Sequence, residues 1–211
     1  MPTKVCKLCF KEIKDNSVRA LIKPHLSLCF NCYKRLRPHF ISFQIYKYKG
    51  LSLYYYDSDI RSLLYQFKGC YDYELKQIFF ERYVNELRLK YLGYVMVPIP
   101  SYEEDDLKRE FNHVVEMFSL LKIPIKKLIR KTSPFKQADH NKKERKEISK
   151  HLELIETKPL THSKILLVDD VYTTGSTMKA AIKLLEKLKP KDIKVLVMAK
   201  TRNDKDYNDT Y

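Results

Sequence analysis

The stretch Ile165–Thr177 reads ILLVDDVYTTGST and decides the fold class. Its first four residues are all apolar, which is typical of a strand buried on both faces of a parallel sheet. Two adjacent acidic residues, Asp169 and Asp170, end this apolar run, and a short loop rich in hydroxyl groups follows around one glycine. Residues 177–188 then show helical periodicity. We therefore predict a strand, a turn and a helix, with the acidic pair at the carboxyl edge of a sheet.

The loop of this stretch has the composition of a phosphate-binding turn. Backbone N–H groups at the start of a helix favour an anion, and Gly175 lets the backbone approach it closely. Carboxylates at the end of the strand suit the hydroxyls of a ribose ring, as in dinucleotide-binding folds. Helix capping alone would also explain the hydroxyl residues, but it does not explain two like charges side by side. The hydroxyl donors are those of Thr173, Thr174, Ser176 and Thr177.

The rest of the chain alternates between predicted strands and predicted helices. Strands are predicted at residues 40–48, 51–56, 94–99, 125–130, 164–168 and 193–199. Helices are predicted at residues 57–67, 73–91, 109–121 and 177–188. This alternation predicts an α/β domain with a parallel sheet. Residues 131–150 are polar and basic, and they are predicted to form a loop that enters a short helix.

Two CxxC pairs near the N-terminus, separated by 19 residues, predict a metal site. Each CxxC turn directs two thiolates at one point, and two turns complete the tetrahedral all-sulfur shell that suits Zn2+. Sites with four cysteines are normally structural, so we expect Zn2+ to hold a small ribbon together. Cys70 is expected to be an ordinary small residue, buried or half-buried. The predicted ligands are Cys6, Cys9, Cys29 and Cys32.

The net charge of +15 is concentrated in two basic blocks. Residues 1–50 carry 11 basic and 2 acidic side chains, and residues 122–150 carry 11 and 3, whereas residues 51–121 carry 8 and 12. Basic blocks favour a polyanionic partner such as nucleic acid, although lysine-rich surfaces also serve solubility alone. Aromatic residues interleave with the basic ones in the first block, which suits single-stranded nucleic acid. The same aromatics would also suffice as the core of so small a module.

Length and composition restrict the cellular setting. A chain of 211 residues can bury one good core plus a small accessory module. No stretch has the roughly 20 apolar residues that a membrane span needs, and the first residues lack the apolar segment of a signal peptide. We therefore expect a cytoplasmic protein whose thiols stay reduced.

The thirteen residues quoted above resemble the signature with which type I phosphoribosyltransferases bind 5-phosphoribosyl-1-pyrophosphate (PRPP). A four-cysteine ribbon ahead of such a domain resembles the ComF family of competence proteins. Further similarity runs through residues 67–69, 97–100 and 109–113. The resemblance implies an α/β fold of the type I phosphoribosyltransferase kind, with a parallel, Rossmann-like sheet, preceded by a small zinc ribbon. We expect the ribbon to span residues 1–48 and the phosphoribosyltransferase-like domain residues 49–211.

The same resemblance implies a set of ligand-binding residues, while no residue is assigned a catalytic role. Mg2+ would bind together with PRPP, the two carboxylates would hold the ribose hydroxyls, and the loop would hold the 5-phosphate. The implied PRPP-binding residues are Asp169, Asp170, Val171, Tyr172, Thr173, Thr174, Gly175, Ser176 and Thr177. The candidate pyrophosphate or closing-loop residues are Lys68, Pro98, Ile99, Pro100, Arg109, Asn112, Gln137 and Arg145.

Several of these residues also have simpler interpretations. Arg109 could pair with acidic neighbours on a helix surface, and Asn112 could cap a helix. Lys68 reads as an exposed lysine near a helix end, and His113 as a solvated helix histidine. The segment 101–106 (SYEEDD) is acidic where relatives often carry basic residues.

Three functions are consistent with these features. We favour a competence accessory protein of natural transformation, which binds PRPP or a related ribose phosphate with Mg2+ and also binds single-stranded DNA. The resemblance implies a helicase-like competence protein and a recombination mediator as partners. The second function is an active phosphoribosyltransferase, which transfers the ribosyl 5-phosphate of PRPP to a base or amine and releases pyrophosphate. The third is a regulator that senses nucleotides and has lost turnover.

Overall fold

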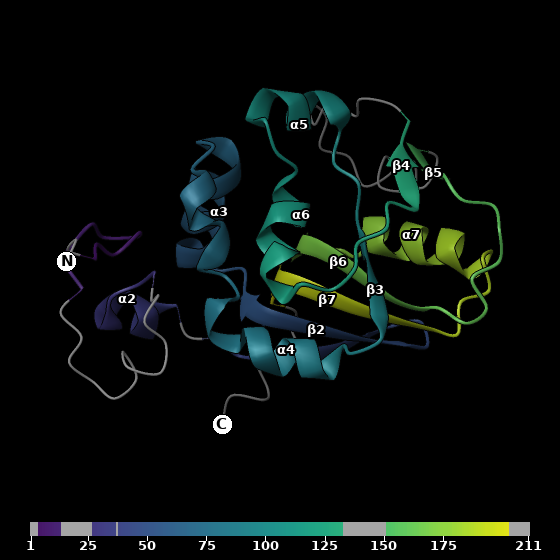
Figure 1. Ribbon diagram of the computed structural model, residues 1–211, viewed down its shortest axis with the longest axis horizontal. Helices are drawn as coiled ribbons and strands as arrows, with labels where there is room; N and C mark the ends of the chain where they lie inside the picture. The colour runs from purple at the N-terminus through teal and green to yellow at the C-terminus, as the bar shows by residue number, and fades with distance from the viewer. Residues whose placement is uncertain (1–3, 14–26, 37, 133–150, 203–211) are drawn as a thin grey trace.

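The computed structural model describes residues 4–13, 27–36, 38–132 and 151–202 (Figure 1). Its centre is a five-stranded sheet with the order β1-β2-β7-β6-β3. β1 is antiparallel to β2, and all other neighbours are parallel, so the predicted α/β class is confirmed. The strands are β1 (Ile41–Ile45), β2 (Tyr48–Tyr55), β3 (Tyr94–Pro98), β6 (Lys164–Tyr172) and β7 (Asp192–Lys200).

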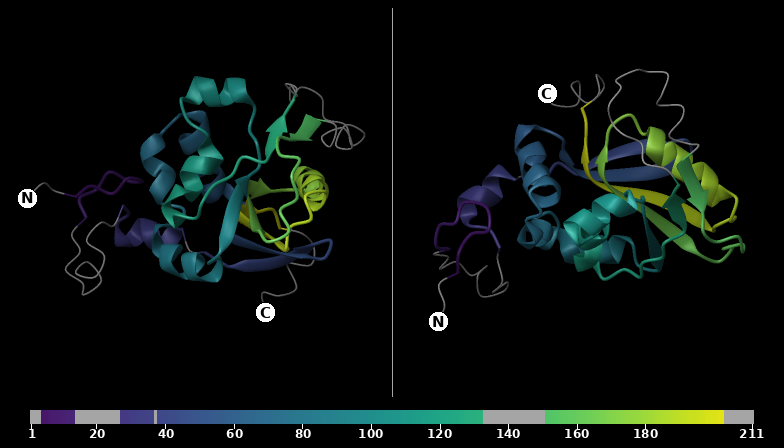
Figure 2. Two further views of the ribbon diagram at one scale, coloured as in Figure 1. Left: turned by 45° about the vertical axis from the view of Figure 1, so that its right-hand side comes forward. Right: turned by 90° about the horizontal axis from the view of Figure 1, so that it is seen from above.

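Helices cover both faces of this sheet (Figure 2). One face packs against α3 (Ser58–Gly69), η1 (Tyr73–Gln77), α4 (Val84–Lys90) and α6 (His113–Phe118). The other face packs against α7 (Ser176–Glu186) and the small hairpin of β4 (Ile129–Lys131) and β5 (Leu152–Leu154). The remaining elements are α2 (Phe30–Arg35), η2 (Glu81–Tyr83), α5 (Glu103–Arg109) and η3 (Ser119–Leu121).

The apolar run of β6 supplies both cores. Leu166 and Val168 belong to the core under α3 and α6, while Ile165 and Leu167 belong to the core under α7. This alternation follows from the two-residue period of a strand, and it explains why the run contains no polar residue. The predicted strand 164–168 is too short, because the ladder with β7 continues through the acidic pair to Tyr172.

The prediction of one helix over residues 73–91 is wrong, because this segment forms three shorter helices, η1, η2 and α4. Ile78, Phe79 and Phe80 lie between these pieces, and all three side chains are buried. Consecutive residues are about 100° apart around a helix, so three of them cannot share the apolar stripe of a surface helix. Burying all three requires the chain to leave the helix.

The helix predicted over residues 109–121 begins later than expected. Arg109 ends α5, Glu110 adopts a positive φ of 63°, and α6 begins at His113. The side chain of Asn112 caps α6 by accepting a hydrogen bond from the N–H of Val115 at 2.9 Å. α5 itself was not predicted, because it buries none of its residues and so shows no apolar periodicity.

The predicted strand 40–48 is two strands joined by a tight turn. Tyr46 has a positive φ of 51°, which ends β1, and β2 begins at Tyr48, three residues before the predicted start of the second strand. The domain boundary expected after residue 48 therefore falls within a hairpin, and the hydrogen bonds of β1 make it a strand of the sheet. The extents of the two domains stay a prediction. Cys70 was expected to be buried or half-buried, but it lies outside both cores and is exposed.

Candidate functional site

Segments far apart in the sequence meet at the carboxyl edge of the sheet, on the left of Figure 1. β3 runs parallel to β6, with Pro98 opposite Val168, and the N–H of Ile99 donates to the Val168 carbonyl at 2.9 Å. Residues Pro98–Pro100 therefore lie beside the strand end that carries the acidic pair. Parallel sheets commonly bind their ligands at this edge.

Asp170 is buried and fully engaged by protein groups. Its Oδ2 lies 2.7 Å from Lys68 Nζ and 3.3 Å from His113 Nε2. Its Oδ1 accepts the N–H of Val171 at 2.6 Å. Burial alone would raise the pKa of Asp170, but the hydrogen bond from His113 and the charge of Lys68 outweigh burial and hold that pKa below its usual range. Asp170 is thus a carboxylate that joins β6 to α3 and α6.

Asp169 has a different environment. Its Oδ1 accepts the N–H of Asp170 at 2.9 Å, and its second oxygen has no hydrogen bond to any residue that the structure describes. Burial and the negative charge of Asp170 raise the pKa of Asp169 well above its usual value. Of the two carboxylates, Asp169 is the one with an oxygen free to meet a ligand hydroxyl or cation.

The two contacts of His113 favour one tautomer of its neutral ring. Arg109 Nη1 lies 3.3 Å from His113 Nδ1. Because a guanidinium can only donate, Nδ1 must accept this hydrogen bond, and the proton of the neutral ring must sit on Nε2. The Nε2–H group then donates to Asp170. Arg109 and Asp170 thus favour the same tautomer of His113.

Arg109 and Asn112 do not themselves contact the acidic pair. Arg109 Nη1 lies 3.3 Å from Asp106 Oδ1, and Asn112 Nδ2 donates to Asp106 Oδ2 at 2.6 Å. Ser101 Oγ donates to the same carboxylate at 2.6 Å. The acidic segment is therefore part of the polar network, and Asp106 receives the donors that a pyrophosphate was expected to receive.

The turn after β6 leaves the start of α7 open. Gly175 has a φ of 72°, which favours glycine, and a Cβ at this position would collide with the Tyr172 ring unless that side chain moved. Thr174 Oγ1 lies 3.0 Å from Ser176 Oγ. Among the residues that the structure describes, no side-chain hydrogen bond caps the start of α7, and no acidic residue lies in its first turn. The first N–H groups of a helix need an acceptor from outside it, and an anion would provide one.

The structure gives some sequence-predicted residues unexpected positions. Lys68 and His113, predicted to be solvated, both contact Asp170, and His113 is buried. Lys68 and His113 are 102 and 57 residues away from Asp170 in the sequence, so no local pattern reveals these contacts. Thr173 and Thr174 are exposed, and Thr177 is half-buried in the first turn of α7. Gln137 and Arg145 lie outside the described residues.

The four cysteines of the CxxC pairs come together as predicted. Their Sγ atoms all lie within 4.8 Å of one another, and those of Cys9 and Cys29 are 3.7 Å apart. Sulfurs around a tetrahedral metal with bonds of about 2.3 Å are about 3.8 Å apart. Burial alone would raise the pKa of Cys6, but backbone N–H groups near its sulfur, those of Cys29, Cys9 and Leu8, lower it to about 7. The cluster thus fits a metal ion.

Known proteins resemble this chain in sequence. The family described as "Phosphoribosyl transferase domain" matches residues 115–211. The competence protein ComFC of Streptococcus pneumoniae is 28% identical over 202 residues, which cover 92% of this chain and 86% of that protein. ComFC of Bacillus subtilis is 26% identical over 215 residues, with coverages of 87% and 89%. Among the described residues, no helix combines the length and hydrophobicity that crossing a membrane demands.

Solved structures also align with part of the chain. A purine phosphoribosyltransferase from Pyrococcus horikoshii aligns with a TM-score of 0.38 and 21% identity, over 60% of this chain and 73% of that one. The predicted resemblance to ComF-type proteins is confirmed by the sequence matches, which extend over about nine tenths of the chain. The chain is therefore similar to the ComFC competence proteins along nearly its whole length, and its residues 115–211 are similar to the phosphoribosyl transferase domain family.

Proposed function

We propose that this chain is a competence accessory protein, which binds PRPP or a related ribose phosphate with Mg2+ and also binds single-stranded DNA. The similarity to ComFC proteins supports the competence role. The observation that carries the ligand assignment is the juxtaposition, at one sheet edge, of an uncapped helix start after Gly175 and a carboxylate with a free oxygen, Asp169. The first suits a phosphate monoester and the second a ribose hydroxyl or a cation.

Each part of the proposed site has its own task. The segment Thr173–Thr177 would hold the 5-phosphate through backbone N–H groups and hydroxyls, with Val171 and Tyr172 shaping its approach. Asp169 would hold the ribose hydroxyls directly. Asp170 would contribute chiefly by fixing Lys68 and His113 beside the ligand, since its own oxygens are engaged. Mg2+ would supply positive charge to the pyrophosphate, and Pro98–Pro100 would line its side of the site.

The cysteine cluster has a separate, structural role in this proposal. Its ion would be Zn2+, because four thiolates at tetrahedral spacing suit that metal. The ribbon of residues 1–48 would carry its basic block toward DNA, ahead of the phosphoribosyltransferase-like domain of residues 49–211. In the cytoplasm, a helicase-like competence protein and a recombination mediator would be its protein partners.

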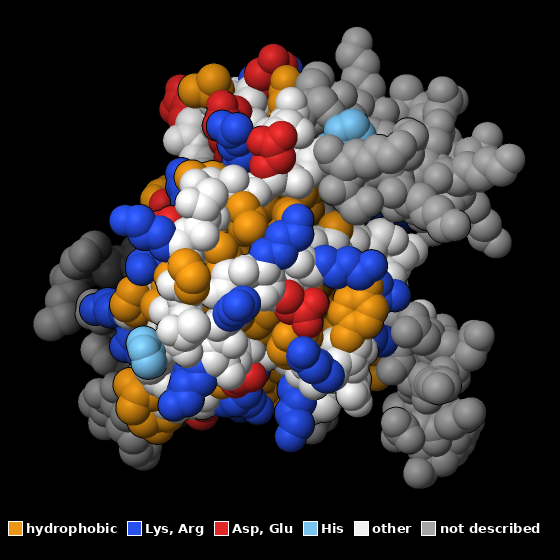
Figure 3. Space-filling model, turned by 90° about the vertical axis from the view of Figure 1, so that its right-hand side faces the viewer, with side chains coloured by type: hydrophobic (Ala, Val, Ile, Leu, Met, Phe, Trp, Pro, Cys, Tyr) orange, Lys and Arg blue, Asp and Glu red, His pale blue; other side chains and the backbone are white. Residues whose placement is uncertain are grey.

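The distribution of positive charge alone does not identify the surface that binds DNA. Figure 3 views the side where the parallel strands begin, and Lys and Arg side chains are scattered there too, while acidic side chains gather at the end formed by α5. DNA binding must therefore be measured directly. Fluorescence anisotropy of a labelled single-stranded oligonucleotide is measured at two salt concentrations, with and without PRPP and Mg2+.

Binding that weakens with salt and changes with PRPP is the expected result, because phosphate contacts release counterions and two coupled sites alter each other's affinity. Absence of DNA binding under every condition would contradict the DNA part of the proposal. The PRPP part is tested independently by calorimetry, so the two parts can fail separately.

An active phosphoribosyltransferase is the second candidate, and the domain match over residues 115–211 favours it. Catalysis would require an acceptor base or amine beside the anomeric carbon and departure of pyrophosphate. Release of pyrophosphate from PRPP in the presence of one member of a panel of bases would establish this activity. PRPP binding without release against the whole panel would leave the accessory role.

A further inference from the structure

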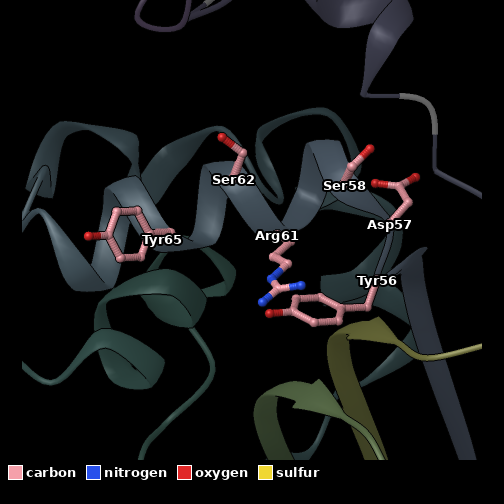
Figure 4. Close-up of a pocket in the computed structure, with 6 residues that line it drawn as sticks. All are labelled: Tyr56, Asp57, Ser58, Arg61, Ser62 and Tyr65. Carbon is pink, nitrogen blue, oxygen red and sulfur yellow. The ribbon is translucent and has the colours of Figure 1, made fainter.

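A pocket of about 510 Å³ lies beside the carboxyl edge, over the outer face of α3 (Figure 4). It belongs to none of the segments assigned above to the ribose phosphate. Its walls combine two tyrosine rings, one guanidinium and three small polar groups. The lining residues are Tyr56, Asp57, Ser58, Arg61, Ser62 and Tyr65.

The pocket continues along one face of α3 toward the acidic pair. The members that lie on α3 recur at helical spacing opposite the buried stripe of the helix, and Lys68 extends their line by one further turn. Lys68 Nζ contacts Asp170 at 2.7 Å. Arg61 and Lys68 are seven residues apart, which is about 10 Å along a helix. A ligand in the pocket would therefore lie close to a ribose phosphate at the sheet edge.

The backbone also connects the pocket to the phosphate-binding turn. The N–H of Tyr56 donates to the carbonyl of Lys200 at 2.8 Å, at the carboxyl end of β7. The next residue, Thr201, donates its N–H to the Tyr172 carbonyl at 3.0 Å. Thr201 Oγ1 also lies 3.3 Å from the Thr173 carbonyl oxygen. Tyr56, in one wall of the pocket, is thus connected to the end of β6 by backbone hydrogen bonds through Lys200 and Thr201.

The side chains of the pocket suit a nucleobase next to a phosphate. Tyr65 is 65% exposed, and its ring lies over Gly69, where an added Cβ would stand 2.9 Å from Cδ2. Arg61 extends its guanidinium beside the ring of Tyr56 (Figure 4), and it forms no ion pair with an acidic residue in the described part of the chain. Exposed tyrosine rings stack on bases, and a free arginine binds phosphate.

We propose that this pocket binds a nucleobase together with its adjacent phosphate, and that single-stranded DNA supplies them. This inference rests on the proposed function and deepens it by naming the contact surface. The basic N-terminal module favours DNA over a free nucleotide, because it adjoins the pocket. Arg35 of α2 forms an ion pair with Asp59, next to the pocket at the start of α3. DNA lying across that module would therefore reach the pocket before the sheet edge.

The test measures the affinity of the full-length, metal-loaded protein for a labelled oligothymidylate by anisotropy. Tyr65→Ala should weaken binding by about 5- to 50-fold, since it removes a stacking surface, while Tyr65→Phe should retain affinity. Arg61→Gln should lower the slope of log affinity against log salt by about 0.7, the value expected for one single-strand phosphate contact. Tyr46→Ala is the matched control, because Tyr46 is also exposed but lies at the opposite edge of the sheet, between β1 and β2.

Each result has a defined meaning. Wild-type affinity in both Tyr65→Ala and Arg61→Gln would overturn the pocket assignment while leaving DNA binding in place. Absence of oligothymidylate binding by the wild type would overturn the DNA part of the proposed function and this inference with it. Competition by thymidine monophosphate as strong, per molecule, as by the oligonucleotide would support the pocket chemistry but assign it to free nucleotides.

Discussion

At the scale of single residues, the acidic pair divides into a structural and an available carboxylate. Asp170 uses both oxygens within the protein, and its pKa is held low because His113 and Lys68 outweigh the effect of burial. Asp169 keeps an oxygen without a partner among the described residues, and burial and the charge of Asp170 raise its pKa. One side chain thereby organises the site while its neighbour is left for a ligand.

The ion pair of Asp170 predicts a pH dependence of stability. A carboxylate with a depressed pKa in the folded state contributes stability at pH values above its unfolded pKa, and this stability is lost as the pH falls through the folded pKa. Lys68→Met removes a charge that holds the pKa of Asp170 down, so the loss of stability in acid should be smaller than in the wild type and should be complete at a higher pH. At neutral pH the variant should be less stable by about 1–2 kcal/mol.

Urea denaturation across the acidic range measures this shift. Lys90→Met is the control, because Lys90 is an exposed lysine at the end of α4. An identical acid limb for Lys68→Met and the wild type would show that the ion pair does not govern the pKa of Asp170.

Arg109 and Asp170 are predicted to favour the same tautomer of His113. Arg109→Leu removes the donor to Nδ1, but the Asp170 carboxylate still accepts from Nε2–H, so the neutral ring should stay mainly in the Nε2–H form with a minor gain of the Nδ1–H form. Nitrogen-15 NMR of the histidine ring distinguishes these forms and should report Nε2–H alone in the wild type. A mixed population already present in the wild type would contradict the assigned hydrogen bonds.

At the scale of elements, the turn between β6 and α7 depends on its glycine. Gly175→Ala adds the strain of a positive φ and also places a Cβ against the ring of Tyr172. We expect a loss of about 1–3 kcal/mol in the free energy of unfolding, together with weaker binding of PRPP.

Gly93→Ala separates the two causes. Gly93 has a φ of 78°, but a Cβ there would meet nothing within 4 Å. This variant should show only the backbone cost and leave PRPP affinity unchanged. Equal effects of both substitutions on stability and on affinity would exclude a role for the contact with Tyr172.

Elements with strong local signals were predictable, and those set by distant contacts were not. The apolar runs of β3, β6 and β7 could be found from the sequence, as could α3, whose N-terminal cap Asp57 accepts the N–H of Ile60 at 2.9 Å. The three-residue strand β5 is too short to show a pattern, and α5 has no buried face.

The same distinction holds within the candidate site. The acidic pair and the glycine of the turn are adjacent in sequence, so their chemistry could be read together. The contacts of Lys68 and His113 with Asp170 exist only because α3 and α6 pack on the same face of the sheet.

At the scale of the whole molecule, the cysteine module and the sheet domain share one core. Cys6, Leu28 and Cys32 belong to the same buried cluster as residues of α3 and β6. Lys7 pairs with Glu74 at 2.7 Å across the junction, and the guanidinium of Arg82 lies 4.0 Å from the centre of the Tyr33 ring. Loss of the metal should therefore destabilise the sheet domain as well as the cysteine module.

Cys29→Ser tests this coupling. The variant should lose its bound metal and melt at a lower temperature than the wild type, because metal binding contributes directly to folding. Metal analysis and calorimetry measure the two effects, and Cys70→Ser is the control, since Cys70 is exposed and outside the cluster. Metal-free wild-type protein with the same melting temperature as the loaded protein would contradict the structural role.

The most direct test of the central claim is a calorimetric titration of PRPP with Mg2+ into the wild type and into the double variant Asp169→Asn, Asp170→Asn. Asp192→Asn at the opposite edge of the sheet is the control for loss of charge. We predict that the wild type and the control bind PRPP, and that the double variant keeps its fold by circular dichroism but binds at least about 100-fold more weakly. Unchanged affinity in the double variant would contradict the assignment of the ribose phosphate site to the carboxyl edge of β6.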